Sequence, residues 1–230
     1  MNKTVKVVIE VLLLFVIAGL TYAIVRSVLK PVEFNRQVAF RSEVAILRLK
    51  DIRTLQVAYK SETGKFLSTI DSLKDFYNNG KVSVVMQIGS LDDSVAVVHT
   101  ERIKKKNRKI TPQQMYQMYL AGDNLLIFSI ENKIAVKDTL FKDRSDFCVD
   151  SLAFIPFSGG EPVIMNAITR PVSGVQVPLF EAKMPYKLLL KGLDNQLRIN
   201  LDHEKMDQNR YEGLQVGSID APNNNAGNWD

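Results

Sequence analysis

The hydrophobic pattern changes twice along the chain, and each part predicts a different kind of structure. Residues 7–25 are almost uniformly apolar, residues 31–62 place apolar side chains three or four positions apart, and beyond residue 80 short apolar runs alternate with turn residues. These patterns are typical of a membrane span, an amphipathic helix and a set of strands. We therefore expect an α+β chain: a single N-terminal transmembrane helix that continues into an amphipathic helix, followed by a mostly antiparallel, β-rich soluble domain.

The segment Val7–Val25 predicts a helix that crosses a bilayer. Its 19 residues include one charged side chain, that of Glu10. At about 1.5 Å per residue, such a helix nearly matches a hydrocarbon core of about 30 Å. Basic residues that can reach lipid headgroups flank it on both sides: Lys3 and Lys6 before it, Arg26 and Lys30 after it.

A cleaved signal peptide is the alternative for this segment, and residues 18–23 weakly resemble a cleavage region. The helical pattern continues past them through Leu29, which favours a retained anchor. The basic residues beyond the span favour a cytoplasmic C-terminal domain, whereas a short N-terminal tail with two lysines is typical of an anchor that leaves the domain outside. Charge counting leaves the orientation open.

The amphipathic stretch predicts a stalk helix with one face made for packing. Gly64 supplies a stop for this helix, because glycine tolerates the left-handed conformation of a C-terminal cap. Pro31 predicts a kink or a junction between the membrane and soluble parts. The apolar positions recur three or four residues apart for much of the stretch: Phe40, Val44, Leu47, Ile52, Leu55, Ala58 and Tyr59.

Residues 5–80 resemble the N-terminal region of type IV pilins and type II secretion pseudopilins. The resemblance lies in the apolar run with a glutamate near its start, in the stretch Ala58–Phe66 with its Tyr59 and Gly64, and in a short helix predicted around residues 70–76. In that family the glutamate pairs with the N-terminus of a neighbouring subunit during assembly, a role that would fall to Glu10. The alternative is that Glu10 lies in the first turns of the helix, where the helix dipole and water stabilise an anion.

The chain departs from this family where pilin precursors are cleaved. Those precursors carry a glycine just before the apolar run, whereas this chain has Thr4, Val5 and Lys6 there, and no glycine precedes Gly19. The resemblance therefore implies an unprocessed relative of the family.

Taken together, these features predict a non-enzymatic, single-pass subunit of a secretion or envelope complex. The resemblance implies a bacterial inner membrane with the C-terminal domain extracytoplasmic, and partners that are the lipid bilayer, further copies or other envelope subunits. The alternative hypothesis is a membrane-anchored binding module whose β-rich half holds a polysaccharide, peptide or lipid. We expect the assembly surface to include these residues: Glu10, Phe40, Val44, Leu47 and Leu55.

The predicted domain order is an anchor over residues 1–30, a stalk and a short helix over 31–80, a β-rich domain over 81–219 and a flexible polar tail over 220–230. In the β-rich part, residues 82–88 and 95–98 predict a hairpin, and Thr111-Pro112 predicts the start of a helix that ends at Gly122. Further strands are expected in the apolar runs 125–130, 134–136, 148–157, 162–168, 172–180, 186–190 and 197–201.

The chain offers little that predicts chemistry. Its net charge is +5, and the dense basic cluster at residues 104–109 is interpreted as a solvated loop, so nucleic acid is not an expected partner. Cys148 is the only cysteine, which excludes an intramolecular disulfide, and we expect it to be buried. Neither His99 nor His203 has a second ligand at metal-binding spacing, and we expect no cofactor, metal or catalytic set.

Overall fold

The computed structural model describes the backbone of residues 3–229, and the side chains of Glu10 and of Leu12 onward. The side chains of Lys3 and Lys6, expected at a membrane surface, lie outside the described residues. The chain forms two compact units, each built from segments distant in sequence, whereas we expected domains that follow one another along the chain. Unit 1 is Met1–Val57, Lys65–Leu73 and Cys148–Asp230; unit 2 is Ala58–Gly64 and Lys74–Phe147.

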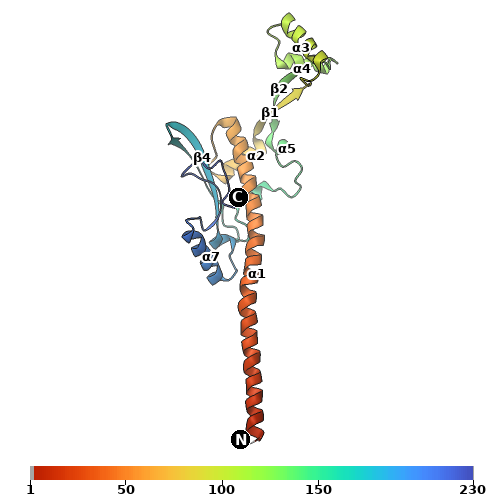
Figure 1. Ribbon diagram of the computed structural model, residues 1–230. Coiled ribbons are helices and arrows are strands. Elements are labelled where there is room, and N and C mark those ends of the chain that lie inside the picture. Colours follow the sequence, from red (N-terminus) through yellow and green to blue (C-terminus); the bar gives the residue numbers. More distant parts are fainter. Residues whose placement is uncertain (1–2, 230) are drawn as a thin grey trace. The chain divides into compact units, whose positions relative to one another are not determined.

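A single long helix, α1 (Lys3–Thr63), includes both the apolar segment and the expected stalk (Figure 1). Pro31 lies inside α1, and the helix continues past it into the stalk, as expected. A proline removes one backbone hydrogen bond, and the helix on each side is long enough to continue. The helix ends as predicted: Gly64 has φ +73° and its N–H donates to the carbonyl of Lys60 at 2.8 Å.

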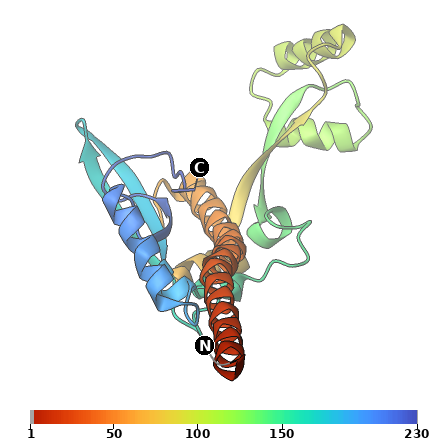
Figure 2. The same ribbon diagram turned by 60° about the horizontal axis from the view of Figure 1, so that its bottom comes forward.

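Unit 1 contains a three-stranded antiparallel sheet that lies on one side of α1 (Figure 2). Strands β3 (Ile164–Val172) and β4 (Val175–Pro185) form a hairpin, and β5 (Gly213–Gly217) pairs with the far end of β4. These two hairpin strands were predicted from their apolar runs. The buried side chains of the sheet include Met165, Leu179, Phe180, Ala182, Met184 and Val216.

Helices replace three of the predicted strands of unit 1. The expected strands at 186–190 and 197–201 are instead α6 (Tyr186–Leu189) and part of α7 (Asn195–Asp207). Residues 149–153 of a third form a 3₁₀ helix, η1. The physical reason is clearest for α7, where the Asp194 carboxylate accepts hydrogen bonds from the N–H groups of Gln196 and Leu197, at 3.0 and 3.1 Å. Such a cap satisfies donors that a helix start leaves free.

The polar tail is not a free end. The Asn228 amide donates to the carbonyl of Gly213 at 2.8 Å, and its side-chain oxygen accepts from Gln215 N–H at 3.0 Å. The Gly217 N–H donates to Ala226 at 3.0 Å, and Val216 pairs with Gly227. The expectation of a flexible tail over 220–230 is therefore wrong for residues 226–228, because their polar groups complete the exposed edge of β5.

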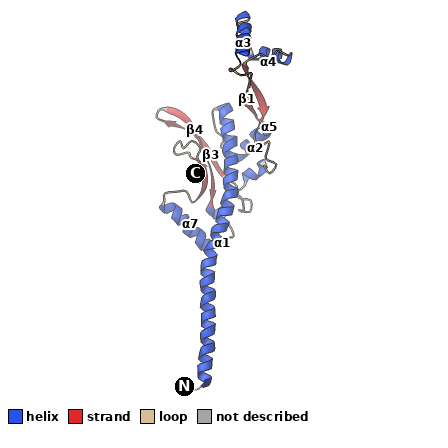
Figure 3. Ribbon diagram, turned by 45° about the vertical axis from the view of Figure 1, so that its right-hand side comes forward, coloured by secondary structure: helices blue, strands red, loops and turns tan. Residues whose placement is uncertain are grey.

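Unit 2 is organised around a two-stranded antiparallel sheet whose strands are distant in sequence. Strand β1 (Lys81–Ile88) pairs antiparallel with β2 (Phe128–Ala135) along its whole length. Helices α3 (Ser94–Lys106) and α4 (Pro112–Leu120) lie between them in sequence. Both helices lie beyond the end of the sheet where β1 ends and β2 begins (Figure 3). The short α5 (Val136–Thr139) follows β2.

The expected hairpin between residues 82–88 and 95–98 is wrong, since the second segment begins α3. The Asp93 carboxylate caps this helix by accepting from the N–H groups of Val95 and Ala96. The prediction for α4 is confirmed, with Thr111 as cap and Pro112 as first residue. The predicted short helix around 70–76 is also present, as α2 (Ile70–Asn79). The chain is thus α+β with antiparallel sheets, as expected, but its C-terminal part holds more helix than predicted.

Candidate functional site

The first half of α1 has the length and composition of a membrane span. From Leu12 onward, an 18-residue window of this helix has a mean hydropathy of 2.2, and none of that window is buried within the structure. The apolar side chains that it exposes include Leu14, Phe15, Ile17 and Leu20. Exposed apolar surface of this extent is unfavourable in water and favourable in lipid. Glu10 is also exposed, near the start of the same helix.

Beyond the apolar segment, α1 has two apolar faces. One is the buried face that supports unit 1: Phe34, Ala45, Leu49, Ile52 and Leu55, each at most 7% exposed. The other carries Phe40 and Leu47, which are 56% and 45% exposed, with Val44 half-buried between them. These three positions lie on one side of the helix because they are separated by three or four residues.

This exposed face brings together three of the predicted assembly residues and excludes a fourth. Phe40, Val44 and Leu47 line a surface groove of about 450 Å³ on α1, together with Glu43 and Lys50. Leu55, in contrast, is fully buried in unit 1 and is unavailable to a partner. Its inclusion in the assembly surface is therefore wrong. The apolar positions that we assigned to one packing face of the helix lie on two different faces.

The exposed face is continuous with an aromatic loop of unit 1. The ring centroids of Phe40 and Phe157 are 5.9 Å apart, and the Arg41 guanidinium lies 4.9 Å from the Phe157 ring. Phe157 has φ +62°, an unusual conformation for a side chain of this size. Gly159 and Gly160 follow it in the same loop, both at positive φ.

Several cations hold this loop and the neighbouring chain against α1. The Arg48 guanidinium donates to the carbonyl of Phe154 at 2.7 Å, and the Lys191 ammonium donates to that of Ser158 at 3.0 Å. Arg41 donates to the carbonyls of Leu189 and Lys191, at 3.2 and 2.9 Å. These bonds keep Phe157 beside Phe40 and so fix the shape of the exposed face.

An ion pair joins the end of the apolar segment to α7. The Lys30 ammonium lies 3.3 Å from the Asp194 carboxylate that caps this helix. Hydrogen bonds from the Leu197 N–H and from Lys30 hold the pKa of Asp194 below its usual value. The pair is exposed to solvent, so its main effect is to position α7 close to the point where α1 leaves the apolar segment.

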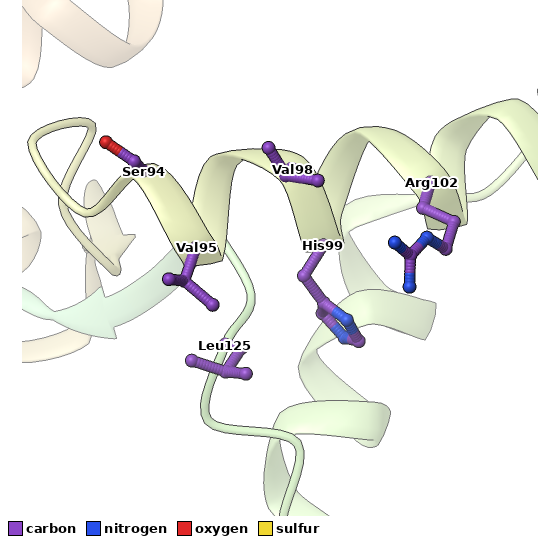
Figure 4. Close-up of a pocket in the computed structure, with 6 residues that line it drawn as sticks. All are labelled: Ser94, Val95, Val98, His99, Arg102 and Leu125. Atoms are coloured by element: carbon purple, nitrogen blue, oxygen red, sulfur yellow. The ribbon is translucent and has the colours of Figure 1, made fainter.

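Unit 2 has a separate groove beside α3 (Figure 4). Its volume is about 470 Å³, and its walls are Ser94, Val95, Val98, His99, Arg102 and Leu125. The groove was not predicted, because the apolar pattern of residues 95–98 is also typical of a strand. The available signal was Asp93 as a helix cap, followed by side chains at i, i+3 and i+7 on one face: Val95, Val98 and Arg102.

The titratable side chains that the structure describes form no cluster typical of a metal site. No group of three His, Cys, Asp or Glu side chains among them converges to hold a metal ion. His99 pairs with Asp123 at 2.9 Å, His203 is exposed, and buried Asp202 pairs with Arg198. Burial raises the pKa of Asp202, although Arg198 opposes this effect. Cys148 is exposed, so its expected burial is wrong: its neighbours Phe147 and Val149 are half-buried instead.

Comparison of the chain with models of protein families, with curated protein sequences and with solved structures found no match.

Proposed function

We propose that this protein is a non-enzymatic, single-pass subunit of a bacterial envelope complex. In this proposal the apolar part of α1 crosses the inner membrane and the two units lie outside the cytoplasm. The exposed face of α1 then joins the subunit to further copies or to related envelope subunits. The resemblance of residues 5–80 to pilins and pseudopilins supports this assignment.

The observation that carries the proposal is the exposed apolar face next to the membrane segment. Phe40 and Leu47 leave about half of their surface in water, although the same helix buries its opposite face completely. Burying such a side chain against a partner contributes about 1.5–3 kcal/mol. Glu43 and Lys50 border the groove, and their opposite charges suit a contact between copies.

Self-association can be tested with two differently tagged copies expressed in the same cells. Purification of one tag in mild detergent should recover the other, and the double variant Phe40→Asp with Leu47→Asp should abolish this recovery. Val175→Asp, which changes an exposed apolar residue of the β3–β4 turn, is the matched control and should leave recovery unchanged. Recovery that survives the double variant, or monomeric wild-type protein without an envelope partner, would refute the proposal.

The orientation has its own test. Alkaline phosphatase fused after Asp230 should be active, because this enzyme needs an extracytoplasmic location, and a fused green fluorescent protein should be dark. Activity with the opposite pattern would place the two units in the cytoplasm. That result would contradict the proposed location while leaving the contact through α1 to be judged by co-purification.

A further inference from the structure

We propose that the groove beside α3 in unit 2 binds an acidic, apolar peptide segment of a partner protein. The inference concerns a different surface from the exposed face of α1 and does not depend on self-association. It assigns a site and a ligand class to the second hypothesis, that of an anchored binding module.

The groove combines an apolar end and a basic end on one helix face. Val95 and Val98 are 65% and 57% exposed, and Leu125 forms the opposite wall. Arg102 follows one turn after Val98, and Lys105 and Lys106 extend the same side of α3 by another turn. A ligand that fills the groove would therefore contact apolar side chains at one end and a positive charge at the other.

Of the cations on this face, Lys105 pairs with Glu101 at 3.9 Å, whereas the Arg102 guanidinium in the groove has no counter-ion among the described residues. The Asp123 carboxylate is engaged by His99, which lines the groove, at 2.9 Å. Arg102 is exposed and forms no ion pair with any residue that the structure describes. A guanidinium in this state favours a carboxylate, which it can bind through two parallel hydrogen bonds.

The walls of the groove are held by buried contacts. Thr100 is buried; its hydroxyl donates to the carbonyl of Leu125 at 3.3 Å and accepts from the N–H of Ile127 at 2.9 Å. Figure 4 shows Val95 and His99 directed toward the segment that carries Leu125. Because α3 and this segment are tied together, the groove exists before a ligand arrives, which lowers the entropic cost of binding.

The shape of the site favours a peptide over a lipid surface. Helices that lie on membranes present large apolar side chains such as Trp, Phe and Leu along a convex face. The apolar residues of α3 here are valines that line a concave groove of about 470 Å³, a size that accepts protruding side chains. The described residues that line it include no Phe, Tyr or Trp to stack on a nucleic acid base, and the imidazole of His99 is engaged by Asp123.

The inference can be tested with a phage-displayed library of random 12-residue peptides. The target is the full-length protein in nanodiscs of neutral phosphatidylcholine. Enriched peptides should share an apolar residue with Asp or Glu within about four positions. One of them, synthesised with a fluorescent label, should bind at least tenfold more weakly to Val98→Asp and to Arg102→Glu when followed by fluorescence anisotropy.

Two variants act as matched controls. Lys104→Glu makes the same charge change on the same helix but on another side, and Val175→Asp places a carboxylate on an exposed valine of unit 1. Both should change the dissociation constant by less than twofold, and circular dichroism should show that all four variants remain folded. A lysine in place of the peptide's acidic residue should restore binding to Arg102→Glu.

Three outcomes would overturn the inference. One is a set of enriched peptides without acidic residues. Another is equal weakening by Arg102→Glu and Lys104→Glu, which would reduce the effect to net charge. The third is co-flotation of the nanodisc-held protein with phosphatidylglycerol vesicles that Val98→Asp and Arg102→Glu abolish, because it would assign the groove to anionic lipid.

Discussion

At the residue scale, Gln56 is the polar group on which unit 1 depends most directly. Its side chain is fully buried, accepts from the N–H of Leu67 at 2.9 Å and donates to the carbonyl of Leu67 at 2.7 Å. The same amide nitrogen lies 3.3 Å from the sulfur of Met165 in β3. One amide thus connects α1, the loop after it and the sheet.

Replacing Gln56 by leucine should lower the free energy of unfolding by about 1–3 kcal/mol, because both backbone groups of Leu67 lose their partner. Urea unfolding of the detergent-solubilised protein measures the change. Thr54→Ala, at an exposed position two residues away, should stay within about 0.5 kcal/mol. Equal stability of Gln56→Leu and wild type would show that water replaces the amide.

Tyr211 should make unit 1 sensitive to alkaline pH. Burial, assisted by Glu212 and Glu181, raises its pKa to about 12, whereas an unfolded tyrosine has a pKa of about 10. The folded state therefore retains the proton that the unfolded state releases. The contribution of Tyr211 to the free energy of unfolding is fully present below pH 10 and is lost as the pH rises toward 12.

Tyr211→Phe should make this alkaline loss of stability shallower, as followed by the thermal unfolding midpoint between pH 9 and 12. Tyr186, whose pKa is also raised by burial, should account for part of what remains. Tyr119→Phe, in unit 2, is the control. A Tyr211→Phe variant with the slope of wild type would exclude this residue as the source.

At the scale of elements, the two faces of α1 should respond differently to truncation. Leu55→Ala removes a fully buried side chain and should cost about 2–5 kcal/mol, whereas Leu47→Ala changes an exposed one and should cost less than about 0.5 kcal/mol. Urea unfolding compares the two variants. Co-purification of tagged copies should be weakened more by Leu47→Ala than by Leu55→Ala. Similar unfolding energies for both variants would contradict the assignment of two faces.

Elements with strong end signals could be predicted from the sequence, and those with ambiguous apolar runs could not. The Gly64 stop and the Thr111-Pro112 start were correctly predicted because each acts through local backbone geometry. Residues 95–98 and 197–201 are short apolar runs whose periodicity fits a strand or a helix. Asp93 and Asp194 favour the helix in each case, because their side chains cap its first turn. This signal is hard to recognise in the sequence, because aspartate is also common in the loops between strands.

At the scale of the whole molecule, the order of elements does not reveal how they pair. Strand β1 pairs with β2 across two intervening helices, and unit 1 closes with strands from the last third of the chain. Local periodicity carries no information about such distant partners. For the same reason the exposed face of α1 was only partly predicted. The sequence pattern does not show that Phe40 and Leu47 are exposed whereas Leu55 is buried, because burial depends on the distant segments that cover one face of the helix.

The most direct test of the account is disulfide cross-linking through α1 in isolated membranes. The background is Cys148→Ser, which removes the only native cysteine. New cysteines replace Leu47, on the exposed apolar face, or Asn35, an exposed residue about a third of a turn away around the helix. If copies meet through the exposed face, mild oxidation gives covalent dimers with Leu47→Cys and not with Asn35→Cys. Equal cross-linking at both positions, or none at Leu47→Cys, would contradict such a contact.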